Sequence, residues 1–189
     1  MSGRPLARDA LWEQAADQHG FFTINQARDL GVTAAALKQL AARGTVTREA
    51  FGVFRFPKWP VSRYDPFMLA VLWTRADEAV LSHETALDAH DISDINPTRI
   101  HVTVAKHRRV RRTGPIPYEL HYEDLQADQI GWWHQIPTVN VPTAIAQCIE
   151  FGTPTYLLRQ AIERGQAAGR LRSDDANVLA ERLEHRHER

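Results

Sequence analysis

The side chains best suited to contacting a partner lie between residues 33 and 55. A lysine can donate to O6 or N7 of guanine, a glutamine can bond adenine through two hydrogen bonds, and alanine methyl groups can pack on thymine. Threonine and arginine can hold phosphates without reading sequence. Residues of the first kind are Ala34, Ala35, Lys38 and Gln39, and residues of the second kind are Thr33, Arg43, Arg48 and Arg55. Together they have the chemistry of a contact surface for double-stranded DNA.

A plainer interpretation exists for the same residues. Lys38, Gln39 and Arg43 would also stand on the outer face of any amphipathic helix, where they keep it in water. The local charge favours the DNA interpretation, because residues 1–60 hold eight Lys and Arg against five Asp and Glu. So few cations predict weak binding by one copy, and therefore two copies on a symmetric site.

A second basic cluster lies at residues 106–112, with the sequence KHRRVRR. Such a density of cations suits a phosphate or an acidic partner. A solvated loop between two strands is an equally good explanation. The residues proposed here for contact with DNA or with a protein are Lys106, Arg108, Arg109, Arg111 and Arg112.

Histidine and cysteine spacing gives no enzyme motif. His83 and His90 lie two helical turns apart, but no third ligand stands nearby in the sequence, so capping and packing roles are expected. His101 and His121 fall in expected strands as half-buried imidazoles, and Cys148 falls in an apolar helix pattern typical of a buried, inert thiol. Glycine-rich phosphate loops and nucleophile motifs are missing. We expect no catalytic residue, no metal ligand and no cofactor.

Three short helices are predicted in the first part of the chain. Apolar residues recur at helical spacing, and a threonine precedes the second and the third helix as a cap. A glycine follows each helix where a left-handed residue would end it. The predicted helices span residues 6–18, 24–30 and 34–43, with Thr23 and Thr33 as the caps.

The pattern then changes from helical to alternating. Val46 and Val53 to Phe56 flank a turn at residues 49–52, which predicts a two-stranded hairpin. Between the second and third helices, Gly31-Val32-Thr33 is a short turn with one apolar residue to bury. Three helices followed by a hairpin is the order of a winged helix-turn-helix, whose third helix enters the major groove by its amino-terminal half. We predict such a DNA-binding domain over residues 1–60.

Residues 61–189 are predicted to form a second domain of mixed α/β structure. The boundary lies at Pro57-Lys58-Trp59-Pro60, because each proline fixes its own φ and keeps its predecessor extended. The fold class is therefore α+β, with an amino-terminal winged helix-turn-helix followed by a mixed α/β domain. Strands are predicted at residues 100–104 and 118–122, a loop carries Trp132 and Trp133, and helices start near Asp65, Ser82, Pro142, Thr153 and Ser173.

Composition limits the protein class. The 189 residues hold 23 Lys and Arg against 23 Asp and Glu, so the formal charge is zero and a nucleic-acid partner must be met by a local patch. A single cysteine excludes a disulfide framework and fits a reducing compartment. No apolar stretch approaches the ~20 residues that span a bilayer. We expect a cytosolic protein without a membrane partner.

Two blocks of sequence resemble the AbiEi family, the antitoxins of abortive-infection AbiE-type toxin-antitoxin pairs. The first block, residues 20–56, has the Gly-Phe-Phe-Thr lead, the Leu-Gly-Val-Thr turn and the Gly-Val-Phe-Arg strand. The second block, SHETALDAHDIS followed by TRIHVTV, is similar to the family's next domain. Residues 139–149 resemble a later helix start, although the arginine expected soon after Pro142 is absent. The likeness covers about residues 6–169.

The resemblance implies an antitoxin that represses its own operon and takes part in phage defence. Its winged helix would bind inverted repeats in its own promoter, and residues 61–189 would counteract a nucleotidyltransferase-like toxin. Only the third-helix and hairpin positions named above carry over as DNA contacts. The chain is not the toxin itself, because the Gly-Ser followed by Asp-x-Asp of a nucleotidyltransferase is missing.

Two other interpretations compete with this one. The first is a protein-interaction module whose winged helix no longer binds DNA and only docks a partner protein. Salt separates the two, because phosphate binding falls steeply with ionic strength. The second is a nuclease or another enzyme, which would need a cluster of acidic residues that the sequence does not offer.

Overall fold

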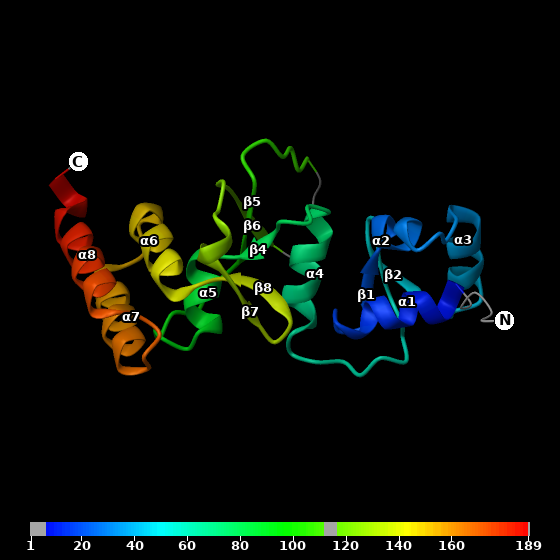
Figure 1. The fold of residues 1–189 in the computed structure, drawn as a ribbon, viewed down its shortest axis with the longest axis horizontal. Coiled ribbons are helices and arrows are strands. Elements are labelled where there is room, and N and C mark those ends of the chain that lie inside the picture. The colour runs from blue at the N-terminus through cyan, green and yellow to red at the C-terminus, as the bar shows by residue number, and fades with distance from the viewer. Residues whose placement is uncertain (1–6, 112–116, 189) are drawn as a thin grey trace. The chain divides into compact units, whose positions relative to one another are not determined.

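The computed structural model describes residues 7–111 and 117–188. The chain divides into two units, the first formed mainly by residues up to Ala79 and the second by most of the chain from Val80 onward. Figure 1 traces both units from the amino to the carboxyl terminus. The predicted domain boundary lies near residue 60, whereas the first unit also includes the helix that follows it.

Three helices of the first unit match the predicted ones closely: α1 (Ala7–Ala16), α2 (Ile24–Asp29) and α3 (Ala34–Ala42). Both predicted caps are confirmed. Thr23 and Gln26 form a capping box, in which the Gln26 N–H donates to Thr23 Oγ1 (3.2 Å) and the Thr23 N–H donates to Gln26 Oε1 (2.8 Å). The Ala36 N–H donates to Thr33 Oγ1 at 3.1 Å, which fixes the start of α3.

The first unit also holds a three-stranded antiparallel sheet in the order β1-β3-β2. Strands β2 (Thr47–Ala50) and β3 (Val53–Arg55) form the predicted hairpin, while β1 (Phe21–Thr23) was not predicted. Gly20 leads into β1 with φ +83°, and a Cβ there would lie 2.4 Å from Trp59 Cγ. Only glycine fits this approach, so β1 can pair with β3 while the chain after β3 packs behind it.

Helices and sheet enclose one apolar core in the first unit. Leu37 of α3 and Val32 of the preceding turn are both buried, as the turn pattern predicted. Phe22 of β1 is fully buried and its ring lies 5.6 Å from that of Phe56. The core residues are Leu11, Ala15, Phe22, Ala27, Val32, Leu37, Val46 and Phe56.

Helix α4 (Asp65–Thr74) is tied to the sheet of the first unit by an ion pair. Arg55 Nη2 at the end of β3 lies 2.9 Å from Asp65 Oδ2, and both side chains are largely buried. Ser62 Oγ donates to the other oxygen of Asp65 at 2.7 Å. Charge pairing across residues 57–64 therefore fixes α4 to the first unit.

The second unit is built on a five-stranded mixed sheet in the order β6-β5-β4-β8-β7. Strands β5 and β6 were predicted, but they pair in parallel, with His101 opposite Glu119 and Thr103 opposite His121. Strands β4, β7 and β8 were not predicted, and the predicted loop at Trp132 and Trp133 is part of β7. The strands are β4 (Val80–Leu81), β5 (Ile100–Val104), β6 (Tyr118–Tyr122), β7 (Ile130–Trp133) and β8 (Ile136–Val139).

Helix α5 packs against β5 and α6, and α6, α7 and α8 pack against one another, as Figure 1 shows. Their core includes Val139, Ile145 and Leu158, together with Cys148, which is fully buried as predicted. The Asn140 side chain caps α6 by accepting from the Thr143 N–H at 3.0 Å. These elements are α5 (His83–Ala89), α6 (Val141–Phe151), α7 (Thr155–Ala167) and α8 (Ser173–Glu184), with short 3-10 turns η1 (Ala127–Gln129) and η2 (His185–Glu188).

The predicted fold class is confirmed: helices and a small sheet at the amino terminus are followed by a mixed sheet with helices. Across residues 7–111 and 117–188, no helix combines the length and the apolar character needed to cross a bilayer.

Candidate functional site

One face of α3 is free of the core and carries the predicted base-contacting residues. Leu37 is 3% exposed and anchors the opposite face. Because exposed and buried positions alternate at helical spacing, the polar residues gather on a single outer stripe. The exposed residues of that stripe are Ala34, Ala35, Lys38 and Gln39.

The turn before α3 holds this face in position. Gly31 takes a left-handed conformation with φ +77°, and the Val32 N–H donates to Ala27 O at 2.8 Å. Thr33 is exposed and its oxygen is used in the cap, so its hydroxyl hydrogen is available toward solvent. At the other end of α3, Arg43 is exposed as the residue that follows the last turn. Both ends of the helix therefore present donors.

The tip of the β2–β3 hairpin gathers cations around an exposed aromatic ring. Phe51 is 59% exposed, and Arg48 Cζ lies 5.4 Å from its ring centroid. Arg75 Cζ lies 5.9 Å from the same ring, and Arg75 Nη2 donates to Asn25 Oδ1 of α2 at 3.1 Å. Sequence reasoning missed Arg75, because it follows α4 and no local pattern joins it to the hairpin.

Arg55 corrects one expectation. It was proposed as a phosphate contact, but its side chain is 9% exposed and pairs with Asp65. Its guanidinium also donates to Pro60 O at 3.0 Å and lies over the Phe21 ring. The alternation of β3 points Arg55 to the α4 side of the sheet, so it has a structural role.

The basic cluster follows β5. Lys106, Arg109 and Arg111 are exposed and Arg108 is half-buried, while Arg112 lies outside the described residues. The Lys106 N–H donates to Asp124 Oδ1 at 3.0 Å, which ties the start of this segment to the chain after β6.

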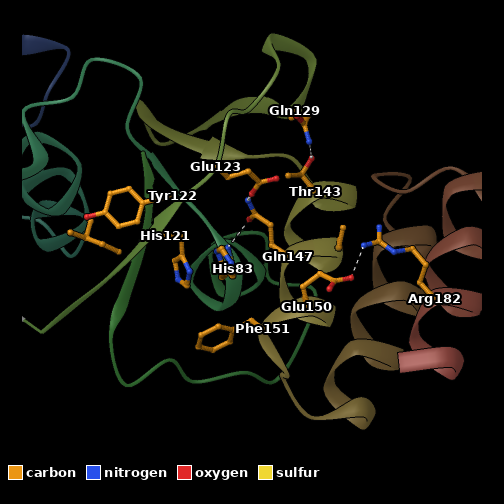
Figure 2. Close-up of a pocket in the computed structure, with 12 residues that line it drawn as sticks. His83, His121, Tyr122, Glu123, Gln129, Thr143, Gln147, Glu150, Phe151 and Arg182 are labelled. Carbon is orange, nitrogen blue, oxygen red and sulfur yellow. Dashed lines mark hydrogen bonds and ion pairs between the residues drawn. The ribbon is translucent and has the colours of Figure 1, made fainter. Parts of the chain in front are cut away.

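The second unit contains a hollow of about 750 Å³ beside β6 and α6 (Figure 2). Gln147 spans it: its Nε2 donates to Glu123 Oε2 at 2.7 Å, and its Oε1 accepts from the His83 N–H at 3.2 Å. On the far side, Arg182 pairs with Glu150 at 3.2 Å. The hollow is thus lined by carboxylates, an amide and imidazoles.

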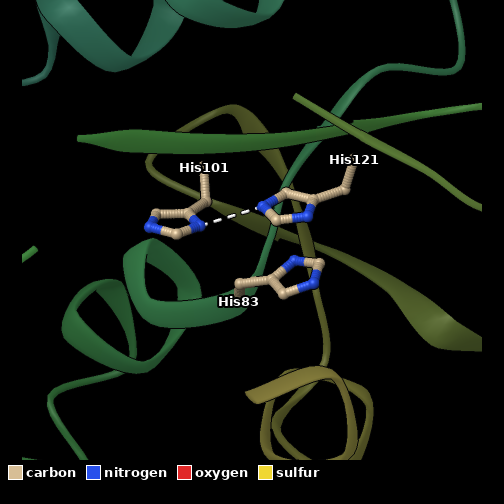
Figure 3. A group of neighbouring side chains, drawn as sticks. All are labelled: His83, His101 and His121. Atoms are coloured by element: carbon tan, nitrogen blue, oxygen red, sulfur yellow. Dashed lines mark hydrogen bonds between the residues drawn. The ribbon is translucent and has the colours of Figure 1, made fainter. Parts of the chain in front are cut away.

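Three histidines lie close together (Figure 3), and two of them, His83 and His121, also line this hollow. Single ring nitrogens of His83, His101 and His121 all lie within 4.8 Å of one another. His101 Nδ1 is 3.0 Å from His121 Nε2, and the His83 and His121 rings stack with centroids 3.5 Å apart. His90, which the sequence pairs with His83, instead contacts Val139 O through Nε2 at 2.8 Å. The cluster therefore joins histidines from three different elements.

Burial keeps these imidazoles neutral. Loss of hydration, together with repulsion from His121 and His101, lowers the pKa of His83 from 6.5 to about 3. Burial and His101 lower the pKa of His121 to about 4, and burial also lowers the pKa of His101. Burial raises the pKa of the Cys148 thiol, as expected for an inert cysteine.

Sequence reasoning missed this cluster for a topological reason. His101 and His121 lie on parallel strands, and His121 stands opposite Thr103, two residues beyond His101. Positions two apart share one face of a sheet, so both rings meet on the side where α5 begins with His83. The proximity of His101 and His121 could have been predicted only if the register of β5 and β6 had been known.

Comparisons with known proteins bear on the first unit most directly. Residues 13–57 match the family model described as "Transcriptional regulator, AbiEi antitoxin". The solved structure of the RV2827C protein from Mycobacterium tuberculosis is similar in fold, with a TM-score of 0.52 and 13% sequence identity over 96% of this chain and 78% of that chain. No curated protein matches the sequence.

The match at residues 13–57 contains α2, α3 and the β2–β3 hairpin, which carry the exposed face described above. It falls on the first of the two blocks in which the sequence resembles the AbiEi family. Residues 13–57 therefore resemble the AbiEi antitoxin regulators, and the match supports the predicted family over this part of the chain.

Proposed function

We propose that this chain is an antitoxin that represses its own operon by binding DNA through its amino-terminal unit and counteracts a nucleotidyltransferase-like toxin. The observation that carries the DNA part is the exposed stripe of α3 beside a cationic hairpin tip. This stripe has the residue types that read base edges, on a helix that lies within the region matched by the regulator family.

Each exposed residue has a separate role in this proposal. Lys38 donates to guanine, Gln39 bonds adenine, and the methyl groups of Ala34 and Ala35 contact thymine. Thr33, Arg43 and Arg48 hold phosphates and so fix the register of the helix in the groove. Arg75 beside Phe51 adds a cation to the hairpin tip, where it strengthens phosphate binding. Arg55 is left out because its charge is used by Asp65.

One copy of the unit offers few phosphate contacts, so its affinity alone is low. Two copies on an inverted repeat would double both the base contacts and the phosphate contacts, and the symmetry of the site would match that of the pair. We therefore infer an operator made of two half-sites, each read by one α3.

Residues 61–189 are proposed to oppose the toxin. Support comes from the antitoxin description of the matching family and from the basic cluster at residues 106–111, which is suited to an acidic surface or to nucleic acid. Lys106, Arg108, Arg109, Arg111 and Arg112 are the residues we assign to this contact.

Fluorescence anisotropy with a labelled duplex from the region upstream of the chain's own reading frame tests the DNA part. We expect tight binding to a segment with an inverted repeat, and log affinity that falls linearly with log salt. A scrambled duplex of equal length is the control. Equal affinity for both duplexes, or binding that salt does not weaken, would favour the protein-interaction module instead.

Co-expression with a nucleotidyltransferase-like protein encoded by a neighbouring gene would test the antitoxin part. We expect the chain to restore growth, and replacement of Arg108, Arg109, Arg111 and Arg112 by serine to weaken either this rescue or DNA binding. Lys58→Ser, outside the basic cluster, is the control. Wild-type rescue and wild-type DNA binding by the four-serine variant would identify the cluster as a solvated loop.

A further inference from the structure

We propose that His83, His101 and His121 form a binding site for a divalent transition-metal ion of the Zn²⁺ class. The inference rests on the second unit alone and is independent of the DNA contacts. It also departs from the expectation of no metal ligand, which was based on spacing along the chain.

The ring nitrogens of the three histidines are close enough to share one ion. A zinc ion binds imidazole nitrogens at about 2.0–2.1 Å, so two nitrogens on one ion lie about 3.4 Å apart in a tetrahedral site. The three candidate nitrogens already lie within 4.8 Å of one another, and one pair is 3.0 Å apart. The His83 and His121 rings are stacked with an interplanar angle of 16°, so one of the two rings must turn for both to bind the same ion.

The backbone conformation of His83 also supports the site. His83 opens α5 with φ +50°, a left-handed conformation that is uncommon for a residue with a side chain. Two contacts hold it there: Gln147 Oε1 accepts its N–H at 3.2 Å, and Ser82 Oγ lies 3.0 Å from its Nδ1. Such backbone strain, stabilised by neighbours and used to place an imidazole beside two others, is typical of a built site.

The carboxylate of Glu84 lies behind one of the three histidines. Glu84 Oε2 lies 3.8 Å from His101 Nε2, the ring nitrogen that points away from His121. Glu84 is itself held, because Thr153 Oγ1 donates to its Oε1 at 2.9 Å. A carboxylate behind a histidine that binds metal orients the ring and makes it a stronger ligand.

Ligand chemistry selects the metal. Imidazole suits zinc, copper and nickel, whereas calcium and magnesium require oxygen ligands that the three nearest side chains do not supply. The hollow beside His83 and His121 gives an ion a route in and leaves a fourth position for water. We therefore assign Zn²⁺ as the ion and solvent as its fourth ligand.

The ion would also stabilise the second unit by linking three of its elements. It would join the first residue of α5 to β5 and to β6, which is an edge strand of the sheet. Because an ion that binds only the folded state stabilises it, zinc should raise the temperature at which the second unit unfolds.

The test uses the full chain without an affinity tag, stripped with a chelator and titrated with ZnCl₂ against a coloured competing chelator. We expect one ion per chain and a rise in the thermal midpoint. His121→Ala should weaken binding at least about a hundredfold and abolish the rise, and Glu84→Gln should weaken it about 10- to 100-fold. The double variant His185→Ala with His187→Ala is the control and should bind as the wild type does.

Several results would overturn the proposal. The first is failure of the wild-type chain to bind zinc in a one-to-one ratio, and the second is wild-type binding by His121→Ala. His121 is half-exposed, so this variant should fold, and circular dichroism verifies that it does. Cobalt provides an independent readout: the wild-type complex should show the strong visible absorption of four-coordinate cobalt, and its absence would contradict the three-histidine site.

Discussion

The outer face of α3 and the histidine cluster of the second unit are assembled in opposite ways. The α3 face comes from consecutive residues of one short helix, so a single capping threonine and one buried leucine are enough to orient it. The cluster draws one residue each from α5, β5 and β6, and its geometry depends on strand register. Contact surfaces made by one helix can be read from a sequence, whereas sites made by several elements must be found in the fold.

A core substitution in the first unit should separate the two regions most strongly. Phe22→Ala removes a fully buried ring from the core below α3 and should lower the free energy of unfolding of that unit by about 3–5 kcal/mol. Urea unfolding followed by tryptophan fluorescence measures the loss. Zinc binding by the second unit should persist in this variant, and its disappearance would mean that the two regions are not separable.

Acid should act on the second region and leave the first intact. The pKa of His83 is about 3 and that of His121 about 4 in the folded chain, below the ordinary value of 6.5. As the pH falls below about 6.5, these histidines therefore become protonated in the unfolded chain while they stay neutral in the folded chain. Each such histidine should cost up to about 1.4 kcal/mol of stability per pH unit, and stability is retained above that pH.

Unfolding in urea with a chelator present, at about pH 7 and about pH 5, measures this effect. His121→Gln removes one of the titrating groups, so its stability should fall less between the two pH values than that of the wild type. An equal fall in both proteins would show that the cluster does not contribute to the pH dependence. The carboxylates around the cluster are Glu84, Glu119 and Glu123.

Replacing a single cation on the proposed DNA-binding surface of α3 and the β2–β3 hairpin should have the smallest effect on affinity. Arg48→Ala removes one proposed phosphate contact per copy, so the slope of log affinity against log salt should become shallower by about 0.9 for each copy bound. Anisotropy titrations at several salt concentrations measure the slope. Lys58→Ala is the matched control, and an equal change in both variants would remove Arg48 from the interface.

Local chemistry explains what the sequence could predict. Thr23 and Thr33 were recognisable as caps because each satisfies backbone N–H groups within three residues along the chain. Val32 was recognisable as the buried residue of the turn because it is the one apolar side chain between Gly31 and Thr33. Strand β1 was missed because three residues are too few to show a period, although its pairing with β3 completes the sheet.

Long-range pairing explains what the sequence could not predict. Arg55 looks like any hairpin cation until Asp65 is placed beside it. Arg75 joins the hairpin tip only because the end of α4 lies beside Phe51. Likewise, His101 and His121 are neighbours because β5 and β6 are parallel, a choice of topology that alternation within either strand does not reveal.

The double variant Lys38→Ala with Gln39→Ala tests the central claim most directly, by the ratio of its affinities for the operator and for a scrambled duplex. Each lost base contact is worth about 1–3 kcal/mol, so operator affinity should fall at least about thirtyfold while scrambled-duplex binding changes little. Lys58→Ala with Gln166→Ala removes the same side-chain types elsewhere and should keep the wild-type ratio. Operator affinity and sequence preference unchanged in the Lys38 and Gln39 variant would contradict recognition of DNA by α3.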